Sequence, residues 1–205
     1  SLWSHLLGRA LEGPMKGTKL KALPSLHVTW AEWKALYPKS VVLSKPKSPR
    51  RYYSFDPYAD YYASPATGIL PTVALDKRLH PKEFILGVEL EGEAKAYPFS
   101  VLSQEKVVND LLGDVPLVVA FRPESASGAV FDRRLEGRTL SFLPQPNDEN
   151  LMADRETESI WGRLTGKALE GPLKGKALRQ VPATSSFWFG WRDYYPGTAI
   201  FKLKP

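Results

Sequence analysis

From residue 84 onward, short hydrophobic runs of strand length alternate with turns that contain glycine. The turns are Glu91-Gly92, Gly113-Asp114 and Glu136-Gly137. Runs of this kind, joined by short turns, predict β-hairpins. We expect three hairpins: residues 84–90 with 94–97, 106–108 with 117–121, and 129–134 with 139–142. The expected fold is therefore α+β and β-rich, with largely antiparallel hairpins and short helices, one of them a single turn over residues 98–102.

An internal repeat relates the start of the chain to its end. Aligned at an offset of 158 residues, segments 1–43 and 159–201 share 17 identical positions, far more than unrelated segments share. We expect two copies of one structural unit. Residues 1–80 would then be the C-terminal part of a first unit, and residues 81–205 would be a second unit.

The repeated segment has readable local structure. Residues 12–17, Glu-Gly-Pro-Met-Lys-Gly, have the composition of a turn, so we expect a hairpin between the strand before them and a strand near residues 20–23. Thr29 and Glu32 fit a capping box, which predicts a short helix that ends before Pro38. In the second copy Phe187 and Gly190 stand at these two positions, so the box is lost and we expect a weaker helix there.

Two further features of the segment predict burial. Trp30 and Trp33 lie three residues apart and share one helix face, which we interpret as core packing, as for their second-copy equivalents. Residues 41–43, Val-Val-Leu, are typical of a buried strand.

The composition excludes several kinds of chemistry. The chain has no cysteine, which excludes disulfides, thiolate catalysis and metal sites with cysteine ligands. Its three histidines, His5, His27 and His80, lack the spacing of metal ligands, and no phosphate loop or dinucleotide motif is present. We therefore expect neither a metal nor a cofactor. The 18 prolines and 2 methionines are typical of a thermophile.

The positive charge is concentrated near the start of the chain. The net charge is +6, and residues 1–51 hold ten basic residues against two acidic ones. Because these charges are spread along the segment, we expect a solvated surface and no nucleic-acid partner, although binding of an anion or nucleic acid by this region is a third hypothesis. No apolar run approaches the roughly 20 residues of a membrane span, so we expect no membrane-spanning segment.

Several motifs carry a family resemblance. They are Glu105-Lys-Val-Val-Asn-Asp110, Ala129-Val-Phe-Asp-Arg133, Leu151-Met-Ala-Asp-Arg155, Thr157-Glu-Ser-Ile-Trp161 and the glycine-rich run from Gly166 to Gly175. In these motifs the chain resembles the bacterial family catalogued as domain of unknown function 3179. The resemblance implies an extracytoplasmic location, periplasmic or secreted, and implies no established activity. It also places Ser1 inside a domain, so we expect a segment upstream of Ser1 in the native protein.

The chain departs from the family at one segment. Where relatives carry Tyr-Cys-Pro-Leu-Cys, this chain has Phe-Arg-Pro-Glu-Ser at residues 121–125. Arg122 and Ser125 thus replace both thiols, so metal or redox chemistry that depends on the pair is not expected here.

Two functional hypotheses remain. The first is a non-catalytic binding or structural protein with an unknown small molecule or protein as partner. The second is a metal-binding protein or hydrolase-type enzyme that uses carboxylates, since paired carboxylates beside arginine can perform acid–base chemistry or hold a hard cation. The alternative to this chemistry is a network of ion pairs and turns. The candidate ligand-binding residues are Glu105, Asn109, Asp110, Arg122, Glu124, Ser125, Asp132, Arg133, Asp154 and Arg155, and Glu156 belongs to the same carboxylate group.

Overall fold

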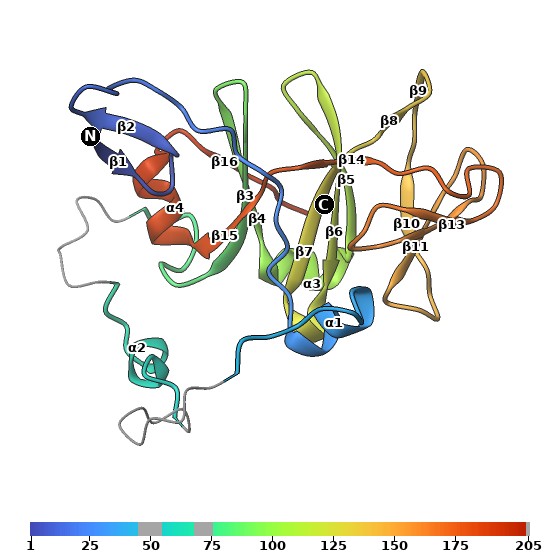
Figure 1. Ribbon diagram of the computed structural model, residues 1–205, viewed down its shortest axis with the longest axis horizontal. Helices are drawn as coiled ribbons and strands as arrows, with labels where there is room; N and C mark the ends of the chain where they lie inside the picture. The colour runs from blue at the N-terminus through green and yellow to red at the C-terminus, as the bar shows by residue number, and fades with distance from the viewer. Residues whose placement is uncertain (45–54, 68–75, 204–205) are drawn as a thin grey trace.

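Two four-stranded sheets form the centre of the protein (Figure 1). The computed structural model describes residues 1–44, 55–67 and 76–203. The first sheet has the order β15-β3-β4-β16 and contains β3 (Phe84–Leu90), β4 (Glu93–Pro98), β15 (Thr184–Phe187) and β16 (Ala199–Ile200). The second has the order β14-β7-β6-β5 and contains β5 (Val107–Leu112), β6 (Val115–Arg122), β7 (Ser127–Asp132) and β14 (Arg179–Val181).

A third sheet and two small hairpins complete the strands. The third sheet has the order β10-β11-β12-β13, with β10 (Phe142–Pro144), β11 (Leu151–Asp154), β12 (Ile160–Gly162) and β13 (Ala168–Glu170). The hairpins are β1 (Leu2–Ser4) with β2 (Arg9–Glu12), and β8 (Arg134–Leu135) with β9 (Arg138–Thr139). Among the strands of the described residues, only β16 and β4 pair in parallel. The predicted fold class, β-rich with antiparallel sheets and a few short helices, is confirmed.

The first two predicted hairpins form, and the third forms only in part. Strands β3 and β4 pair across Glu91 and Gly92, whose φ angles of 54° and 90° are left-handed, and β5 pairs with β6. Strand β7 pairs with β6 and β14, so of the predicted pairing of residues 129–134 with 139–142 only the end next to the turn is present, where Arg134 pairs with Thr139. The turn at residues 136–137 closes only the small β8–β9 hairpin.

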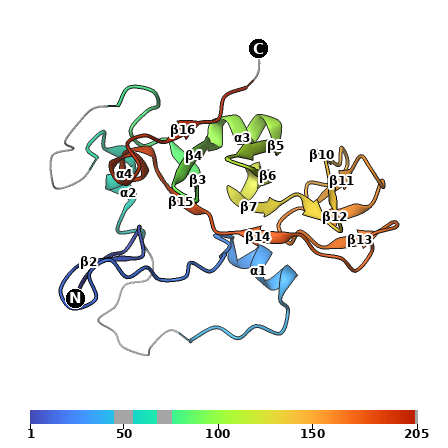
Figure 2. The same ribbon diagram turned by 90° about the horizontal axis from the view of Figure 1, so that it is seen from above.

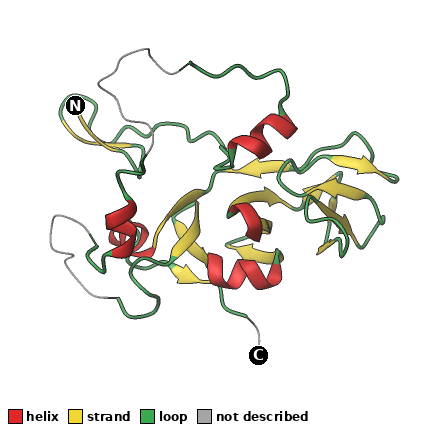
Figure 3. Cartoon of the chain, turned by 90° about the horizontal axis from the view of Figure 1, so that it is seen from below, coloured by secondary structure: helices red, strands yellow, loops and turns green. Residues whose placement is uncertain are grey.

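Within the described residues, four short α-helices and one 3₁₀ turn accompany the sheets (Figure 3). They are α1 (Trp30–Leu36), α2 (Ala59–Ala63), α3 (Phe99–Glu105), α4 (Trp188–Tyr194) and η1 (Pro123–Ser125). The capping box of α1 is confirmed: Glu32 N donates to Thr29 Oγ1 at 3.2 Å, and Thr29 N donates to Glu32 Oε2 at 3.0 Å. Helix α4 has Phe187 as its N-cap and lacks a side-chain cap, as its sequence predicts.

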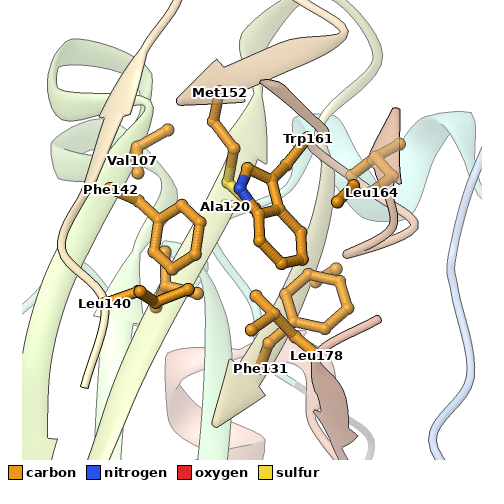
Figure 4. Close-up of a cluster of buried hydrophobic side chains, with 12 residues drawn as sticks. Val107, Ala120, Phe131, Leu140, Phe142, Met152, Trp161, Leu164 and Leu178 are labelled. Atoms are coloured by element: carbon orange, nitrogen blue, oxygen red, sulfur yellow. The ribbon is translucent and has the colours of Figure 1, made fainter. Parts of the chain in front are cut away.

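Trp161 occupies the centre of the core between the second and third sheets (Figure 4). It is fully buried, and its ring meets that of Phe142 edge-on at a centroid distance of 5.6 Å. Its indole Nε1 donates to Asp154 Oδ2 at 2.8 Å, so the polar atom of a buried tryptophan has a partner. A second core lies between the first and second sheets, and a third gathers Trp188 and Trp191 of α4 against β3 and β4.

The N-terminal segment differs from these expectations. Figure 2 shows the β1–β2 hairpin projecting away from the sheets. The predicted burial of Trp30 and Trp33 is wrong, because both are exposed, and residues 41–43 form no strand and are exposed. Residues 20–23 form no strand either, and the chain returns through a single bridge between Arg9 and Lys19. These differences have one physical reason. Among the described residues, no sheet packs against Trp30 and Trp33 or pairs with residues 20–23 and 41–43.

Candidate functional site

The end of the β6–β7 hairpin places three donor side chains together. Arg122 ends β6, Ser125 ends η1, and Ser127 begins β7. Pro123 starts the 3₁₀ turn, where its fixed φ is compatible and no amide N–H is required. Ala126 then adopts a left-handed φ of 51°, which turns the chain back into β7. Two of the three donors, Arg122 and Ser125, stand at the positions where the sequence comparison expects the family's cysteines.

A carboxylate from a distant part of the chain fills this cluster. Glu32 of α1 accepts hydrogen bonds from Arg122 Nη1 at 2.6 Å, Ser125 Oγ at 2.6 Å and Ser127 Oγ at 2.9 Å. Thr29 adds its backbone N–H and its hydroxyl, each at 3.0 Å. Glu32 is 8% exposed, so a nearly buried carboxylate is satisfied by five donors. Helix α1 is thereby fixed to the second sheet by charge-assisted hydrogen bonds.

The environment of Glu32 keeps the carboxylate ionised. Burial alone raises the pKa of Glu32, but hydrogen bonds from Ser125, Thr29 and Ser127 favour the charged form and lower the pKa below its ordinary value. A carboxylate with a lowered pKa and occupied lone pairs is a poor general base. Ser125 next to it is therefore not activated as a nucleophile.

A cavity of about 340 Å³ lies beside this contact. Its walls come from α1 on one side and from the ends of β6, β11 and β12 on the other. Most of the lining is apolar, and a few polar groups converge on it, namely Glu32, Arg122, Asn150, Arg163 and Thr165. This volume and this mixture of surfaces are typical of sites for small organic ligands.

Arg163 lies beneath the cavity and is fully buried. Its guanidinium donates to the backbone oxygens of Leu151 at 2.9 Å and Phe121 at 3.4 Å, while Nε has no partner. Burial lowers the pKa of Arg163, and Glu149 opposes this shift through its charge. Glu149 itself pairs with Lys106 at 2.9 Å. In the part of the chain that the structure describes, no carboxylate forms a salt bridge with Arg163, although the charges of Glu149 and Asp148 favour its ionised form.

Asp132, another candidate, belongs to a separate ion-pair network. Its carboxylate accepts from Arg134 through both the backbone and the side chain, and from Arg179 Nη2 at 2.8 Å. Burial raises the pKa of Asp132, but these hydrogen bonds outweigh burial and bring the pKa to about 2. Asp132 thus ties β7 to β14 and to the following hairpin.

Three more candidates also hold strands and turns together. Asn109 exchanges two hydrogen bonds with the backbone of Phe142 at 2.7 and 2.8 Å, which joins β5 to β10. Asp110 pairs with Lys95 at 2.5 Å and accepts from Tyr97. Asp154 accepts from the backbone and hydroxyl of Thr157 and from Trp161, which fixes the β11–β12 turn.

The remaining candidates do not line this cavity. Glu105 ends α3 and Glu124 lies in η1, and both are exposed. Arg133 donates to Leu140 O at 2.7 Å, and burial lowers its pKa. Arg155 is exposed, and Glu156 accepts from Ser141 N at 2.8 Å. Of the candidates, Arg122 and Ser125 meet at Glu32, whereas Arg133 lies within reach of the charges of Glu156, Asp110 and Asp132. The described residues contain no group of three or more potential metal ligands.

Sequence reasoning missed the residues that complete the site. Glu32 was recognised only as part of a capping box, and Ser127, Asn150 and Arg163 were not singled out. One signal was available: at the offset of 158 residues Glu32 aligns with Gly190, so a carboxylate stands at this position only in the first of the two similar segments.

Comparisons with known proteins identify the family. A search of curated proteins and a search of solved structures each found no significant match. No helix within the described ranges has the length and apolar character needed to span a membrane. One family model matches the chain twice, over residues 1–90 and over residues 76–205, and it is described as "Protein of unknown function (DUF3179)". The two matches together cover the whole chain, which therefore belongs to this family.

Proposed function

We propose that the protein is a non-catalytic binding protein whose ligand is a small organic molecule, held in the cavity between α1 and the second and third sheets. The observation that carries the proposal is the cavity itself, about 340 Å³ in volume, mostly apolar, with Arg122 and Asn150 at its polar side. Such a site favours a ligand with an apolar body and one polar or anionic group.

The polar side of the cavity sets the orientation of this ligand. Arg122 lines the cavity and uses Nη1 for Glu32. A guanidinium at the wall of an apolar cavity favours a carboxylate, sulfonate or phosphate. The buried charge of Arg163 adds to the same preference, although this side chain does not reach solvent.

The placement of the other carboxylates supports binding over catalysis. Asp110, Asp132 and Asp154 each belong to a different structural network, and each is satisfied there. Glu32, the carboxylate at the cavity, has a lowered pKa and five donors. A general base needs a pKa near the working pH and a free lone pair, so this residue is better suited to holding α1.

An extracytoplasmic location stays a prediction from the family resemblance.

A fluorescent probe tests the proposal. Anilinonaphthalene sulfonate combines an apolar ring system with an anionic group, and we expect saturable binding at one site per chain. Ala35→Trp should reduce the affinity at least tenfold, because Ala35 lines the cavity. Lys34→Trp is the matched control: it lies on the same helix, is exposed and does not line the cavity, so its affinity should be unchanged. Equal binding by both variants would show that the probe binds elsewhere and would refute the proposal.

A further inference from the structure

The two repeat segments have matching local structure but opposite exposure. Position by position at the offset of 158 residues, Leu20 is 63% exposed and Leu178 6%, Trp30 is 47% exposed and Trp188 1%, and Trp33 is 37% exposed and Trp191 2%. The first segment therefore presents to solvent the side chains that the second segment buries. Exposed aromatic and aliphatic residues that a matching segment buries point to an interaction surface.

The local geometry of the two segments recurs in detail. Met15 N donates to Ser1 Oγ at 2.9 Å, and Leu173 N donates to Ser159 Oγ at 3.0 Å. The turn glycine of each segment approaches this serine so closely that an added Cβ would lie 2.8 Å from Ser1 Cα or 2.7 Å from Ser159 Cα. The start of the first segment thus has the same local geometry as the start of the second segment.

The helices repeat this correspondence. Trp33 Nε1 donates to Ser40 Oγ at 2.9 Å, and Trp191 Nε1 donates to Thr198 Oγ1 at 3.0 Å. Each tryptophan also packs against the tyrosine four residues later, at centroid distances of 4.6 Å for Tyr37 and 4.2 Å for Tyr195. The arrangement that α4 uses for packing already exists in α1 on a solvent-exposed face.

The second segment shows what such a face packs against. It closes the body formed by residues 84–157: β15 pairs with β3, β16 with β4, and β14 with β7. The ring of Trp191 lies over Gly87 of β3, where a Cβ would come within 2.5 Å of the ring carbons. Trp188 joins the same core with Ile85 and Ala96. The surface that binds the second segment is therefore a sheet whose edge strands are free to pair, and Gly87 leaves space on it for the ring of Trp191.

From this correspondence we infer that residues 1–43 close a further sheet body of the same family, built like residues 84–157 and joined to Ser1 as residue 158 is joined to Ser159. A second copy of this chain does not fit the role, because its own β14, β15, β16 and α4 already fill the corresponding surfaces. Exposed residues 41–43 would then pair with a β4-like strand, as Ala199 and Ile200 pair with β4.

Helix α1 would connect the two bodies. Its Glu32 side holds the β6–β7 end through Arg122, while Trp30 and Trp33 remain available to the further body. Gly190, which stands at the position of Glu32 in α4, carries no such side chain. This explains why only the first segment has a carboxylate at this position: only its helix contacts two bodies.

A fusion protein tests the inference. A copy of residues 76–158 is placed before Ser1 of the full chain, and hydrogen exchange is followed by mass spectrometry. We expect exchange in residues 2–12 and 30–43 to slow at least tenfold, to the level of residues 160–170 and 188–201. Quenching of tryptophan fluorescence by acrylamide should fall in parallel.

Two controls make every outcome decisive. Gly87→Val in the added copy alone should abolish the protection from hydrogen exchange, because the valine side chain would occupy the space of the tryptophan ring. Rapid exchange in residues 2–12 and 30–43, or an added copy that does not fold, would overturn the inference, because the first segment is proposed to complete that body. Sedimentation of the unfused chain is the second control. Dimerisation that Trp33→Lys abolishes would also overturn it, by assigning the surface to a second copy.

Discussion

The carboxylate of Glu32 lies 2.6 Å from Nη1 of Arg122, across 90 residues of sequence. This contact fixes α1 to the end of the β6–β7 hairpin and forms one wall of the cavity. Because the side chains of both residues are largely buried, loss of either partner leaves a charge without its counterion in a poorly solvated place.

Ser125→Ala should weaken the docking of α1 by about 1 kcal/mol, the typical value of one hydrogen bond. The pKa of Glu32 is lowered in the folded protein, so its stabilisation is present above the ordinary carboxyl pKa and is lost as the pH falls through the lower folded value. Removing the Ser125 hydroxyl raises that folded value. As the pH is lowered, the faster hydrogen exchange that reports undocking of residues 30–36 should therefore begin at a higher pH in the variant than in the unmodified protein. Ser44→Ala, at an exposed position, should leave the profile unchanged.

Asp132 should contribute to acid unfolding. Its folded pKa of about 2 lies below the ordinary value of 3.8, so its contribution is complete above pH 4 and disappears as the pH falls toward 2. Its partners Arg134 and Arg179 are half exposed or more, which reduces the contribution to about 1–2 kcal/mol. Urea unfolding of Asp132→Asn between pH 2 and pH 6 should show a smaller loss of stability than the unmodified chain. An identical slope in both proteins would assign the acid sensitivity to other carboxyl groups.

Trp161 and Trp3 form a matched pair for stability. Trp161→Ala should lower the free energy of unfolding by about 4 kcal/mol, because it empties the centre of a buried core and leaves Asp154 without a donor. Trp3→Ala should cost about 1 kcal/mol or less, because Trp3 is only half-buried in a projecting hairpin. Urea titration followed by circular dichroism measures both. Comparable losses would mean that the N-terminal hairpin is covered in solution.

The protein purified without chelators should contain well below one metal ion per chain by elemental analysis. The physical reason is that the carboxylates of the described residues are distributed over separate networks. A stoichiometric metal that Asp110→Asn or Asp154→Asn removes would contradict the proposed non-catalytic function and favour the carboxylate-based enzyme.

Local sequence signals predicted much of the fold. The Glu91-Gly92 turn, the strands on either side of Gly113-Asp114 and the Thr29–Glu32 capping box are all present, because each depends on residues close together in the chain. The errors concern burial and long-range pairing. Trp33 and residues 41–43 have core-like sequences, but burial requires a sheet that lies outside these segments.

The candidate site was predictable only in part. The family resemblance singled out Arg122 and Ser125, and the structure places both against Glu32 of α1. Their partner Glu32 is far away in sequence, and a capping box gives no hint that the same carboxylate also accepts hydrogen bonds from another element. No sequence pattern pointed to Arg163, because its burial and its hydrogen bond to the backbone oxygen of Leu151 depend on how the third sheet packs.

A double-mutant cycle on Glu32 and Arg122 tests the central claim most directly. Glu32→Gln, Arg122→Gln and the double variant are compared by hydrogen exchange of residues 30–36, which reports the free energy of α1 docking. The account predicts that the two substitutions are strongly non-additive, with a coupling energy of about 1.5–3 kcal/mol. Additive effects, or unchanged exchange in Glu32→Gln, would contradict it, because α1 would then be held by contacts other than this carboxylate.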